Sequence, residues 1–247
     1  MSYERFASIY DELMSDAPYD KWVEYTKSEI SKAGLQSPKI LDLGCGTGSM
    51  LLQFAKHGLY AVGVDLSDEM LMMAKEKLEK HSIKPELFQQ DMSELDLGQM
   101  FNCIVIYCDS LNYLQDEERV RQTFKQAYSH LEEGGLLLFD VHSIFKIDEL
   151  FIGQTFAYDG IENAYIWNSF EGEYPHSVVH ELTFFAWNEN KQAYERFEEE
   201  HYQRTFSISQ YMQWGKEAGF TSMEVSSDFK NCPPSEESER LFFSFKK

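Results

Sequence analysis

The chain has 247 residues, with 42 acidic and 22 basic side chains, and its formal net charge at pH 7 is -20. A surface this acidic repels polyanions, and no basic stripe occurs along the chain, so we expect neither RNA nor DNA as a partner. No apolar run approaches the about 18 residues that cross a bilayer, and the N-terminus lacks the apolar region of a signal peptide. We expect a cytoplasmic protein without membrane contact.

The length suits one sheet-based domain that carries an insertion, and a chain of this size needs no disulfides to be stable. Its four cysteines, Cys45, Cys103, Cys108 and Cys232, form neither a Cys-x-x-Cys pair nor a cluster with histidine. Because such pairs and clusters are the usual signs of redox and zinc sites, we expect reduced thiols and no metal site.

The first 34 residues show helical spacing of apolar side chains. One face carries Phe6, Ile9, Tyr10, Leu13 and Met14, and a second carries Trp22, Val23, Thr26 and Ile30. Apolar residues at this spacing predict amphipathic helices.

The most specific motif lies between residues 39 and 48. Lys39–Leu43 predicts a buried parallel strand, and Gly44, Gly46 and Gly48 follow it at alternate positions. A helical pattern comes next and stops at Gly58. Glycine has no Cβ, so the backbone can turn sharply and approach a ligand closely. A strand, a glycine loop and a helix in this order predict a nucleotide site at the carboxyl end of a parallel sheet.

The spacing of these glycines discriminates between nucleotide ligands. The dinucleotide fingerprint Gly-x-Gly-x-x-Gly would require a glycine where this chain has Ser49. A phosphate-binding P-loop would require a lysine after the glycines, and none is present. We therefore expect a nucleoside ligand without a pyrophosphate.

Acidic residues end the next two predicted strands. Residues 60–64 form a strand that ends in Asp65, about 20 residues beyond the glycines, where a carboxylate can accept both ribose hydroxyls. Ser67 is expected to cap the following helix. A third strand at residues 87–88 leads into Gln90-Asp91-Met92.

Strands and helices alternate through most of the remaining chain. We expect strands at Phe101–Tyr107, Leu136–Val141, Thr221–Asp228 and Arg240–Phe245, and helices at Asp116–Leu131 and Ser207–Ala218, the first of them ended by Gly134-Gly135. This alternation predicts a doubly wound α/β domain with a mostly parallel sheet.

Between Asp148 and Phe206 the pattern changes to a period of two. Residues 178–187 and 194–204 alternate on either side of a turn, and Ala164–Phe170 is a further strand candidate. The pattern predicts an aromatic-rich antiparallel sheet at residues 148–206, inserted into a domain formed by residues 1–147 and 207–247. Two roles are open for this sheet: it is either a cap over a substrate site or a dimerisation surface.

Three motifs in this order resemble those of the class I S-adenosylmethionine (SAM) dependent methyltransferases, and the resemblance covers essentially the whole chain. They are Asp-x-Gly-x-Gly-x-Gly at residues 42–48, VGVDLSDEML at residues 62–71, and Gln90-Asp91-Met92. The resemblance implies a Rossmann-like, mostly parallel sheet of seven strands with an antiparallel last strand, and SAM as cofactor. It implies that Asp91 takes the adenine amino group, while the Met92 amide meets the ring nitrogen.

The N-terminal residues resemble the helical lid of the small-molecule branch of this family, which includes glycine and nucleotide-sugar N-methyltransferases. The resemblance implies a lid at residues 1–34, in which Tyr10 contacts the methionine end of SAM and Tyr19 is a weaker candidate. The SAM contacts that it implies are Tyr10, Asp42, Gly44, Cys45, Gly46, Gly48, Asp65, Leu66, Asp91, Met92 and Tyr107. Core packing is the alternative for both tyrosines of the lid.

Candidate catalytic residues follow the fourth and fifth strands. Methyl transfer requires alignment of a nucleophile and sometimes removal of a proton. Asp109 is placed to bind the SAM amino group or to orient an amine acceptor. His142 is the best-placed base, because imidazole titrates near pH 6.5. A structural role is the alternative for His142. Asp140 and His142 are also candidate metal ligands, but the sequence shows no second acidic pair in the right context to complete such a site.

We expect a SAM-dependent methyltransferase that acts on nitrogen or oxygen of a small molecule. The aromatic and acidic insertion favours a neutral or amine-bearing acceptor over a phosphorylated one. A nicotinamide-dependent oxidoreductase is the first alternative, against which the glycine spacing argues. A SAM-binding or interaction protein without catalysis is the second, and a homodimer is compatible with each of these functions.

Overall fold

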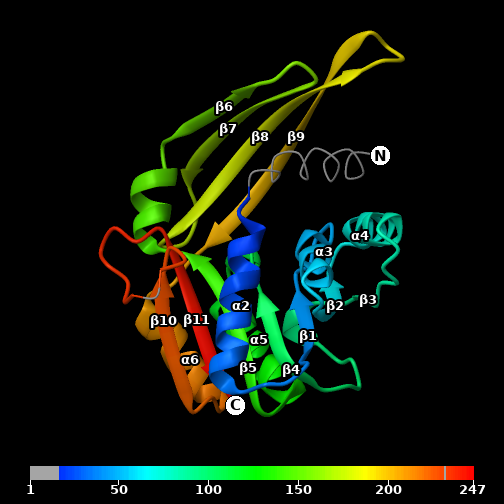
Figure 1. Ribbon diagram of the computed structural model, residues 1–247. Coiled ribbons are helices and arrows are strands. Elements are labelled where there is room, and N and C mark those ends of the chain that lie inside the picture. Colours follow the sequence, from blue (N-terminus) through cyan, green and yellow to red (C-terminus); the bar gives the residue numbers. More distant parts are fainter. Residues whose placement is uncertain (1–16, 231) are drawn as a thin grey trace.

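The computed structural model describes residues 17–230 and 232–247, which form two sheets. The larger sheet has seven strands in the order β10-β11-β5-β4-β1-β2-β3. Its strands are β1 (Lys39–Leu43), β2 (Tyr60–Asp65), β3 (Leu87–Gln89), β4 (Phe101–Ile106), β5 (Leu131–His142), β10 (Ser222–Ser227) and β11 (Arg240–Lys246). Only β11 runs antiparallel to its neighbours, β10 and β5. The doubly wound, mostly parallel sheet predicted from the sequence is confirmed (Figure 1).

Helices cover both faces of this sheet. They are α2 (Tyr19–Ala33), α3 (Ser49–Lys56), α4 (Asp68–Lys80), α5 (Glu117–His130) and α6 (Ile208–Ala218), with short turns η1 (Met92–Glu94), η2 (Ser110–Tyr113) and the π-helical η3 (Lys146–Phe151). Alternate residues of a strand point to opposite faces. Accordingly, Ile104 of β4 packs in the cluster with α5 and α6, whereas Val105 packs in the cluster with α2 and α3.

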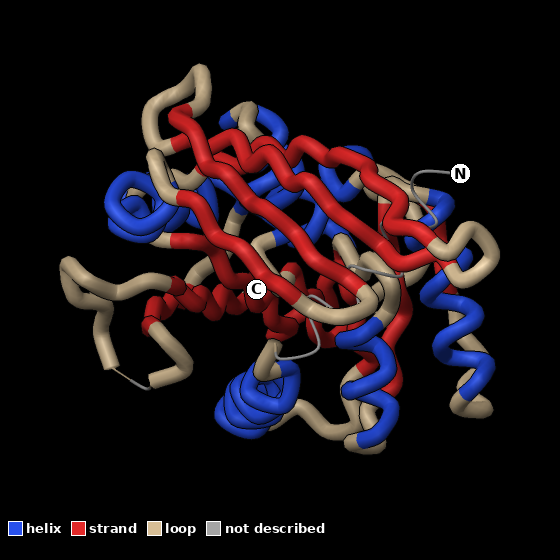
Figure 2. The backbone as a smooth tube through the Cα atoms, turned by 90° about the horizontal axis from the view of Figure 1, so that it is seen from above, coloured by secondary structure: helices blue, strands red, loops and turns tan. Residues whose placement is uncertain are grey.

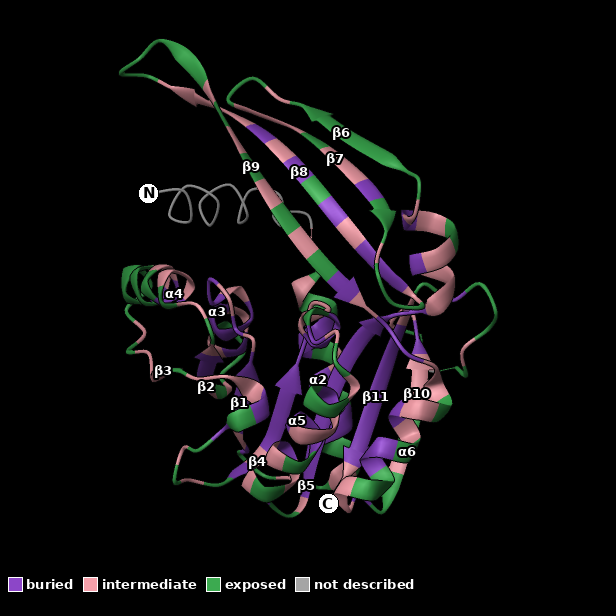
Figure 3. Cartoon of the chain, turned by 180° about the vertical axis from the view of Figure 1, so that it is seen from behind, coloured by how far each residue is buried: buried purple, intermediate pink, exposed green. Residues whose placement is uncertain are grey.

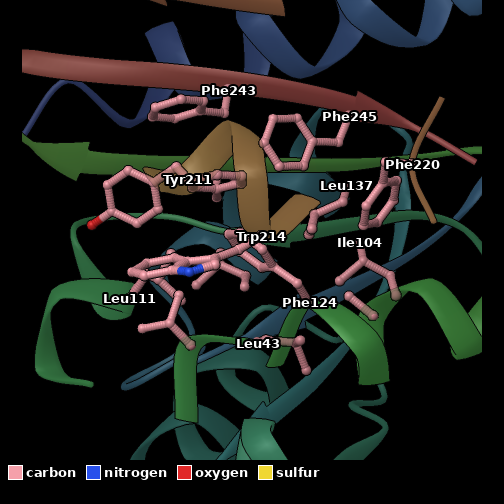
Figure 4. Close-up of a cluster of buried hydrophobic side chains, with 14 of the residues drawn as sticks. Leu43, Ile104, Leu111, Phe124, Leu137, Tyr211, Trp214, Phe220, Phe243 and Phe245 are labelled. Atoms are coloured by element: carbon pink, nitrogen blue, oxygen red, sulfur yellow. The ribbon is translucent and has the colours of Figure 1, made fainter. Parts of the chain in front are cut away.

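Aromatic side chains fill the core on the α5–α6 face. Phe139 of β5 stacks on Phe243 of β11 with ring centroids 4.6 Å apart. Tyr211 of α6 lies 5.3 Å from Phe243, and Figure 4 shows these rings together with Trp214. Offset and edge-to-face aromatic pairs add to the free energy gained by burial. This cluster fixes β11 beside β5, and Arg240 of β11 is thereby placed in register with His142.

Two segments differ from the predicted elements. Helix α5 ends at His130, and β5 already begins at Leu131, which pairs with Phe101 before a register shift. Gly134 and Gly135 therefore lie inside a strand, not at the end of the helix. Strand β6 (Thr155–Asp159) was not predicted. All five of its residues are exposed, so buried and exposed side chains do not alternate along it.

The smaller sheet, here called the cap sheet, consists of β6, β7 (Asn163–Glu171), β8 (Ser177–Asn188) and β9 (Ala193–Arg204), all antiparallel. It extends across the carboxyl ends of the parallel strands of the larger sheet (Figures 1 and 2). Its residues alternate between more and less buried along β8 and β9, as Figure 3 shows.

The inner face of the cap sheet is the one that carries Trp167, Leu182, Phe184 and Phe197. It packs against Met70 of α4, and so faces the glycine-loop side of the molecule. Helix α4 begins as expected at Ser67, whose hydroxyl accepts a hydrogen bond from the Met70 amide at 3.2 Å. Within the described residues, no helix is both long and apolar enough to span a membrane.

Candidate functional site

The glycine loop leaves β1 in a backbone conformation that side chains rarely adopt. Gly44, Gly46 and Gly48 have φ of +76°, +52° and +77°. A Cβ on Gly44 would lie 2.8 Å from Ser110, and one on Gly48 would lie 2.9 Å from Ala74, so these two glycines allow close packing. A Cβ on Gly46 would meet no atom within 4 Å. Gly46 is therefore the glycine of this loop that leaves room for a ligand against the backbone.

Asp65 lies against this loop at the end of β2. Its Oδ2 accepts a hydrogen bond from the Gly46 amide at 2.8 Å, and its Oδ1 accepts one from the Ser67 amide at 2.9 Å. Burial raises the pKa of Asp65, although these amides oppose the shift. A carboxylate has about four acceptor positions, so Asp65 can still accept a hydrogen bond from a ligand hydroxyl. The adjacent Leu66 side chain is 64% exposed and offers an apolar surface beside them.

Asp42 supplies an unsatisfied carboxylate at the base of the loop. It is 2% exposed, and among the described residues no donor reaches its Oδ2. Burial, together with the charge of Asp65, raises its pKa to about 8. A buried carboxyl oxygen without a partner is costly, and a cationic ligand group would relieve that cost. SAM carries a sulfonium and an amino group, so the Asp42 carboxyl oxygen fits it as an acceptor.

Of the other predicted cofactor residues, Cys45 and Met92 lie at the glycine loop, whereas the Asp91 carboxylate is bonded to other protein groups. Cys45 is part of the loop, and its amide is bonded to the Val64 carbonyl at 3.0 Å. Met92 reaches Gly44, since its methyl group lies 3.3 Å from the position of a Cβ there. Asp91 caps η1 through the Ser93 amide at 2.9 Å and forms an ion pair with Arg119, so its carboxylate already has protein partners.

The side chain of Tyr107 is directed away from these residues. Its hydroxyl is 2.7 Å from the Thr26 hydroxyl of α2, and its ring is 2% exposed in the α2–α3 core. The structure therefore does not bring its side chain to the glycine loop. Ser110, which the sequence did not single out, lies there instead: its hydroxyl donates to the Tyr107 carbonyl at 2.8 Å and lies 3.2 Å from the Gly44 carbonyl. Tyr10 lies outside the described residues.

Asp109 and His142 are brought together at the ends of β4 and β5. Nε2 of His142 lies 3.4 Å from Oδ2 of Asp109, and both side chains are largely buried. Asp109 has a φ of +55°, a conformation that costs free energy in a residue other than glycine and is common at functional sites. The side-chain amide of Gln203 from β9 donates to Asp109 Oδ2 at 2.8 Å. The pair thus lies where the cap sheet meets the parallel sheet.

Arg240 is a further partner of Asp109, and the sequence analysis missed it. Its guanidinium donates to Asp109 Oδ1 at 2.9 Å and also bonds to the fully buried Asp140. Trp22 completes the group, because its indole N–H donates to Asp140 at 2.8 Å. Burial alone would raise the pKa of Asp109, but His142 and Arg240 outweigh it and hold that pKa well below its usual range.

His142 is neutral near pH 7. Burial lowers its pKa because the imidazolium would lose its hydration, and the neighbouring Asp109 only partly offsets this. Its backbone is fixed on both sides: the amide donates to Asn112 at 3.0 Å, and the carbonyl accepts from Thr205 at 2.6 Å. Its Nδ1 is buried with no hydrogen-bond partner among the described residues. An oriented neutral imidazole with a free nitrogen has the properties of a general base.

The described residues contain no group of three or more His, Cys, Asp or Glu side chains that could hold a metal ion.

Comparisons with known proteins agree with this geometry. Residues 40–135 match the model of a methyltransferase domain. A protein of Geobacillus sp. (strain WCH70) that is itself classed with the methyltransferases is 49% identical over 248 residues, 100% of both chains. A SAM-dependent methyltransferase from Clostridium acetobutylicum has 30% identity and a TM-score of 0.89 over 100% of this chain and 99% of that one.

A third relative shares only part of the chain. It is the dTDP-3-amino-3,4,6-trideoxy-alpha-D-glucopyranose N,N-dimethyltransferase of Streptomyces venezuelae, 32% identical over 103 residues, 42% of each chain. Full-length similarity, the seven-stranded sheet and the glycine loop with its two carboxylates lead to one assignment. The chain belongs to the class I SAM-dependent methyltransferases, and SAM is its cofactor.

Proposed function

We propose that the enzyme transfers the methyl group of SAM to a nitrogen or oxygen atom of a small molecule held between the parallel sheet and the cap sheet. The observation that carries this proposal is the bond from Gln203 to Asp109 at 2.8 Å. Through it, the inner face of the cap sheet and the carboxyl ends of β4 and β5 share one polar site. A buried site of this kind suits a small acceptor better than a polymer.

Each residue of the site has a distinct role in this proposal. Asp42, Gly46 and Asp65 hold SAM, which supplies the methyl group on a positively charged sulfur. Asp109, kept ionised by Arg240, orients a donor group of the acceptor. His142 removes a proton through its unpaired Nδ1.

The inner face of the cap sheet favours an uncharged or amine-bearing acceptor. Strand pairing places Tyr165, Trp167, Phe184 and Phe197 on this face, together with Glu199. Aromatic faces attract cations within about 6 Å, and carboxylates repel anions. Within the described β6–β9, the positions that share this face include no lysine or arginine, so a nucleoside diphosphate of the kind named for the Streptomyces relative lacks a basic counterpart here. The name of that relative does support nitrogen as the methylated atom.

The outer face of the cap sheet is separate from this site. It carries the exposed side chains Ile166, Phe170, Tyr194 and Tyr202. Dimerisation through the inserted sheet stays a prediction, and in this geometry it would use the face that turns away from SAM.

Transfer of an isotope-labelled methyl group tests the proposed function. The enzyme is incubated with labelled SAM and either a metabolite extract or purified total RNA, and the label is counted in each product. We expect label in the low-molecular-weight fraction and background counts in RNA. The Asp65→Ala variant serves as the control for non-enzymatic methylation. Label found mainly in RNA would show that the acceptor is misassigned.

A further inference from the structure

Two buried histidines, one from each sheet, contact the same aromatic ring. His142 ends β5, and His180 lies on the inner face of β8; their exposed fractions are 5% and 3%. The Phe151 ring of η3 meets both imidazoles edge to face, with centroid distances of 5.2 Å and 5.0 Å. Each histidine has one buried ring nitrogen without a hydrogen-bond partner among the described residues, Nδ1 of His142 and Nε2 of His180.

The protonation state of His180 follows from its neighbours. The indole N–H of Trp167 donates to His180 Nδ1 at 2.9 Å, and the Ser169 hydroxyl lies 2.9 Å from the same nitrogen. An indole N–H can only donate, so Nδ1 must be the nitrogen without a proton. Burial lowers the pKa of His180 to about 4, which keeps the ring neutral at pH 7. The proton of the neutral ring is therefore on Nε2, and His180 presents an unpaired N–H donor.

In His142 the unpaired ring nitrogen is the one without a proton, the opposite of His180. Its Nε2 faces Asp109, which is ionised and can only accept hydrogen bonds. The proton of the neutral ring is therefore on Nε2, and the unpaired Nδ1 presents a lone pair. The pair thus offers one buried donor and one buried acceptor. The side-chain amide of Gln203 lies near enough to His180 to raise its pKa, but it does not reach hydrogen-bond geometry with Nε2.

We propose that His142 and His180 together bind one hydroxyl group of the methyl acceptor, whose O–H donates to His142 Nδ1 and whose oxygen accepts from His180 Nε2. A hydroxyl meets both requirements because its oxygen has one proton and two lone pairs, so one lone pair remains. A carboxylate or an ether lacks the proton. An amine that is to be methylated has a single lone pair, which the transfer itself uses, so that nitrogen cannot also accept a hydrogen bond from His180 Nε2. His180 is thus a specificity-determining residue for a hydroxyl-bearing acceptor.

This inference rests on the proposed function, and its test uses three probes that differ at one group. The probes are trans-2-aminocyclohexanol, its O-methyl ether and cyclohexylamine, each titrated into the full-length protein with S-adenosylhomocysteine present. Long-range proton–nitrogen NMR spectra report the ring nitrogens of both histidines. We expect protons on Nε2 of both rings, shifts of His142 Nδ1 and His180 Nε2 with the alcohol, and at least tenfold tighter binding of the alcohol than of either other probe. The exposed His57 is the internal control.

Variants of His180 separate recognition from folding. His180→Phe should abolish the preference for the alcohol while the dissociation constant for SAM stays within twofold, and His180→Gln, which keeps an N–H donor, should restore part of the preference. Three outcomes overturn the inference: equal or undetectable binding of all three probes, a proton on Nδ1 of His180 in the wild type, or an unchanged preference in His180→Phe. Each of these is distinct from failure of the proposed function, which would show as absence of methyl transfer to any small molecule.

Discussion

The carboxylate of Asp65 bonds to the amide of Gly46, 19 positions earlier in the chain, at 2.8 Å. This bond joins the ends of β1 and β2 and places an acidic side chain beside the one loop glycine with open space above its backbone. The first two predictions concern these two residues.

Asp65→Ala should weaken SAM binding. Loss of a charge-assisted acceptor to the ribose costs about 1.5 to 3 kcal/mol, which corresponds to a roughly 10- to 150-fold higher dissociation constant. Calorimetric titration with SAM measures this constant. Asp68→Ala, three residues further along and exposed, is the matched control and should bind normally. A dissociation constant within twofold of the wild type would remove Asp65 from the ribose role.

Gly46→Val should abolish SAM binding without unfolding the protein. The matched control is Gly58→Val, because Gly58 also has a positive φ, +73°, and open space around a new Cβ. Both variants should lose at least about 1 to 2 kcal/mol of stability from the left-handed backbone. Only the first should lose SAM, since only there does the new side chain occupy the ligand's place. Equal SAM affinities in the two variants would contradict the assignment of the loop.

SAM binding should release protons at pH 7. The pKa of Asp42, about 8, keeps it mostly protonated in the free enzyme, and a cationic ligand lowers that pKa. Binding should therefore release up to about one proton and become tighter as pH rises from 6 to 8. Titrations in buffers of different ionisation enthalpy count the protons, and Asp42→Asn should remove the release. A proton count near zero in the wild type would show that no cationic group approaches Asp42.

Arg240→Leu should destabilise the fold strongly. Its removal leaves the fully buried Asp140 without its charge partner, and breaking a buried pair on one side costs about 3 to 5 kcal/mol. The control is Arg196→Leu, whose pair with Glu198 is solvent-exposed and contributes about 0 to 1 kcal/mol. Urea denaturation gives both values. Similar losses in the two variants would mean that Arg240 has no special structural role.

The sequence predicted the cofactor half of the site well because its signals are local. Glycines end β1 abruptly, and Asp65 ends the next apolar run, so both positions could be read from neighbouring residues. The acceptor half depends on long-range register. Arg240 pairs with His142 across β11 and β5, and Gln203 reaches Asp109 from the cap sheet. No spacing along the chain encodes these contacts, so the sequence analysis found Asp109 and His142 without their partners.

The same distinction explains the errors in the fold. Strand β6 is exposed along its whole length and pairs only with β7, so no buried residue marked it. The start of β5 at Leu131 depends on pairing with Phe101, about 30 residues away, and this pairing carries the strand through Gly134-Gly135. A glycine pair is ordinarily a sign of a turn.

The pH profile of methyl transfer in wild type and in His142→Ala tests most directly the claim that the acceptor reacts at the Asp109–His142 pair. Burial and the charges of Arg240 and Lys146 lower the pKa of His142, while Asp109 raises it. The neutral ring is the base, so with SAM saturating at every pH the wild-type rate should be flat at pH 7 to 8 and should fall as pH drops through a pKa below 6.5. His142→Ala should lose this limb and about 10²- to 10⁴-fold in rate at pH 7.5. A variant with the wild-type rate and the same acidic limb would contradict the account.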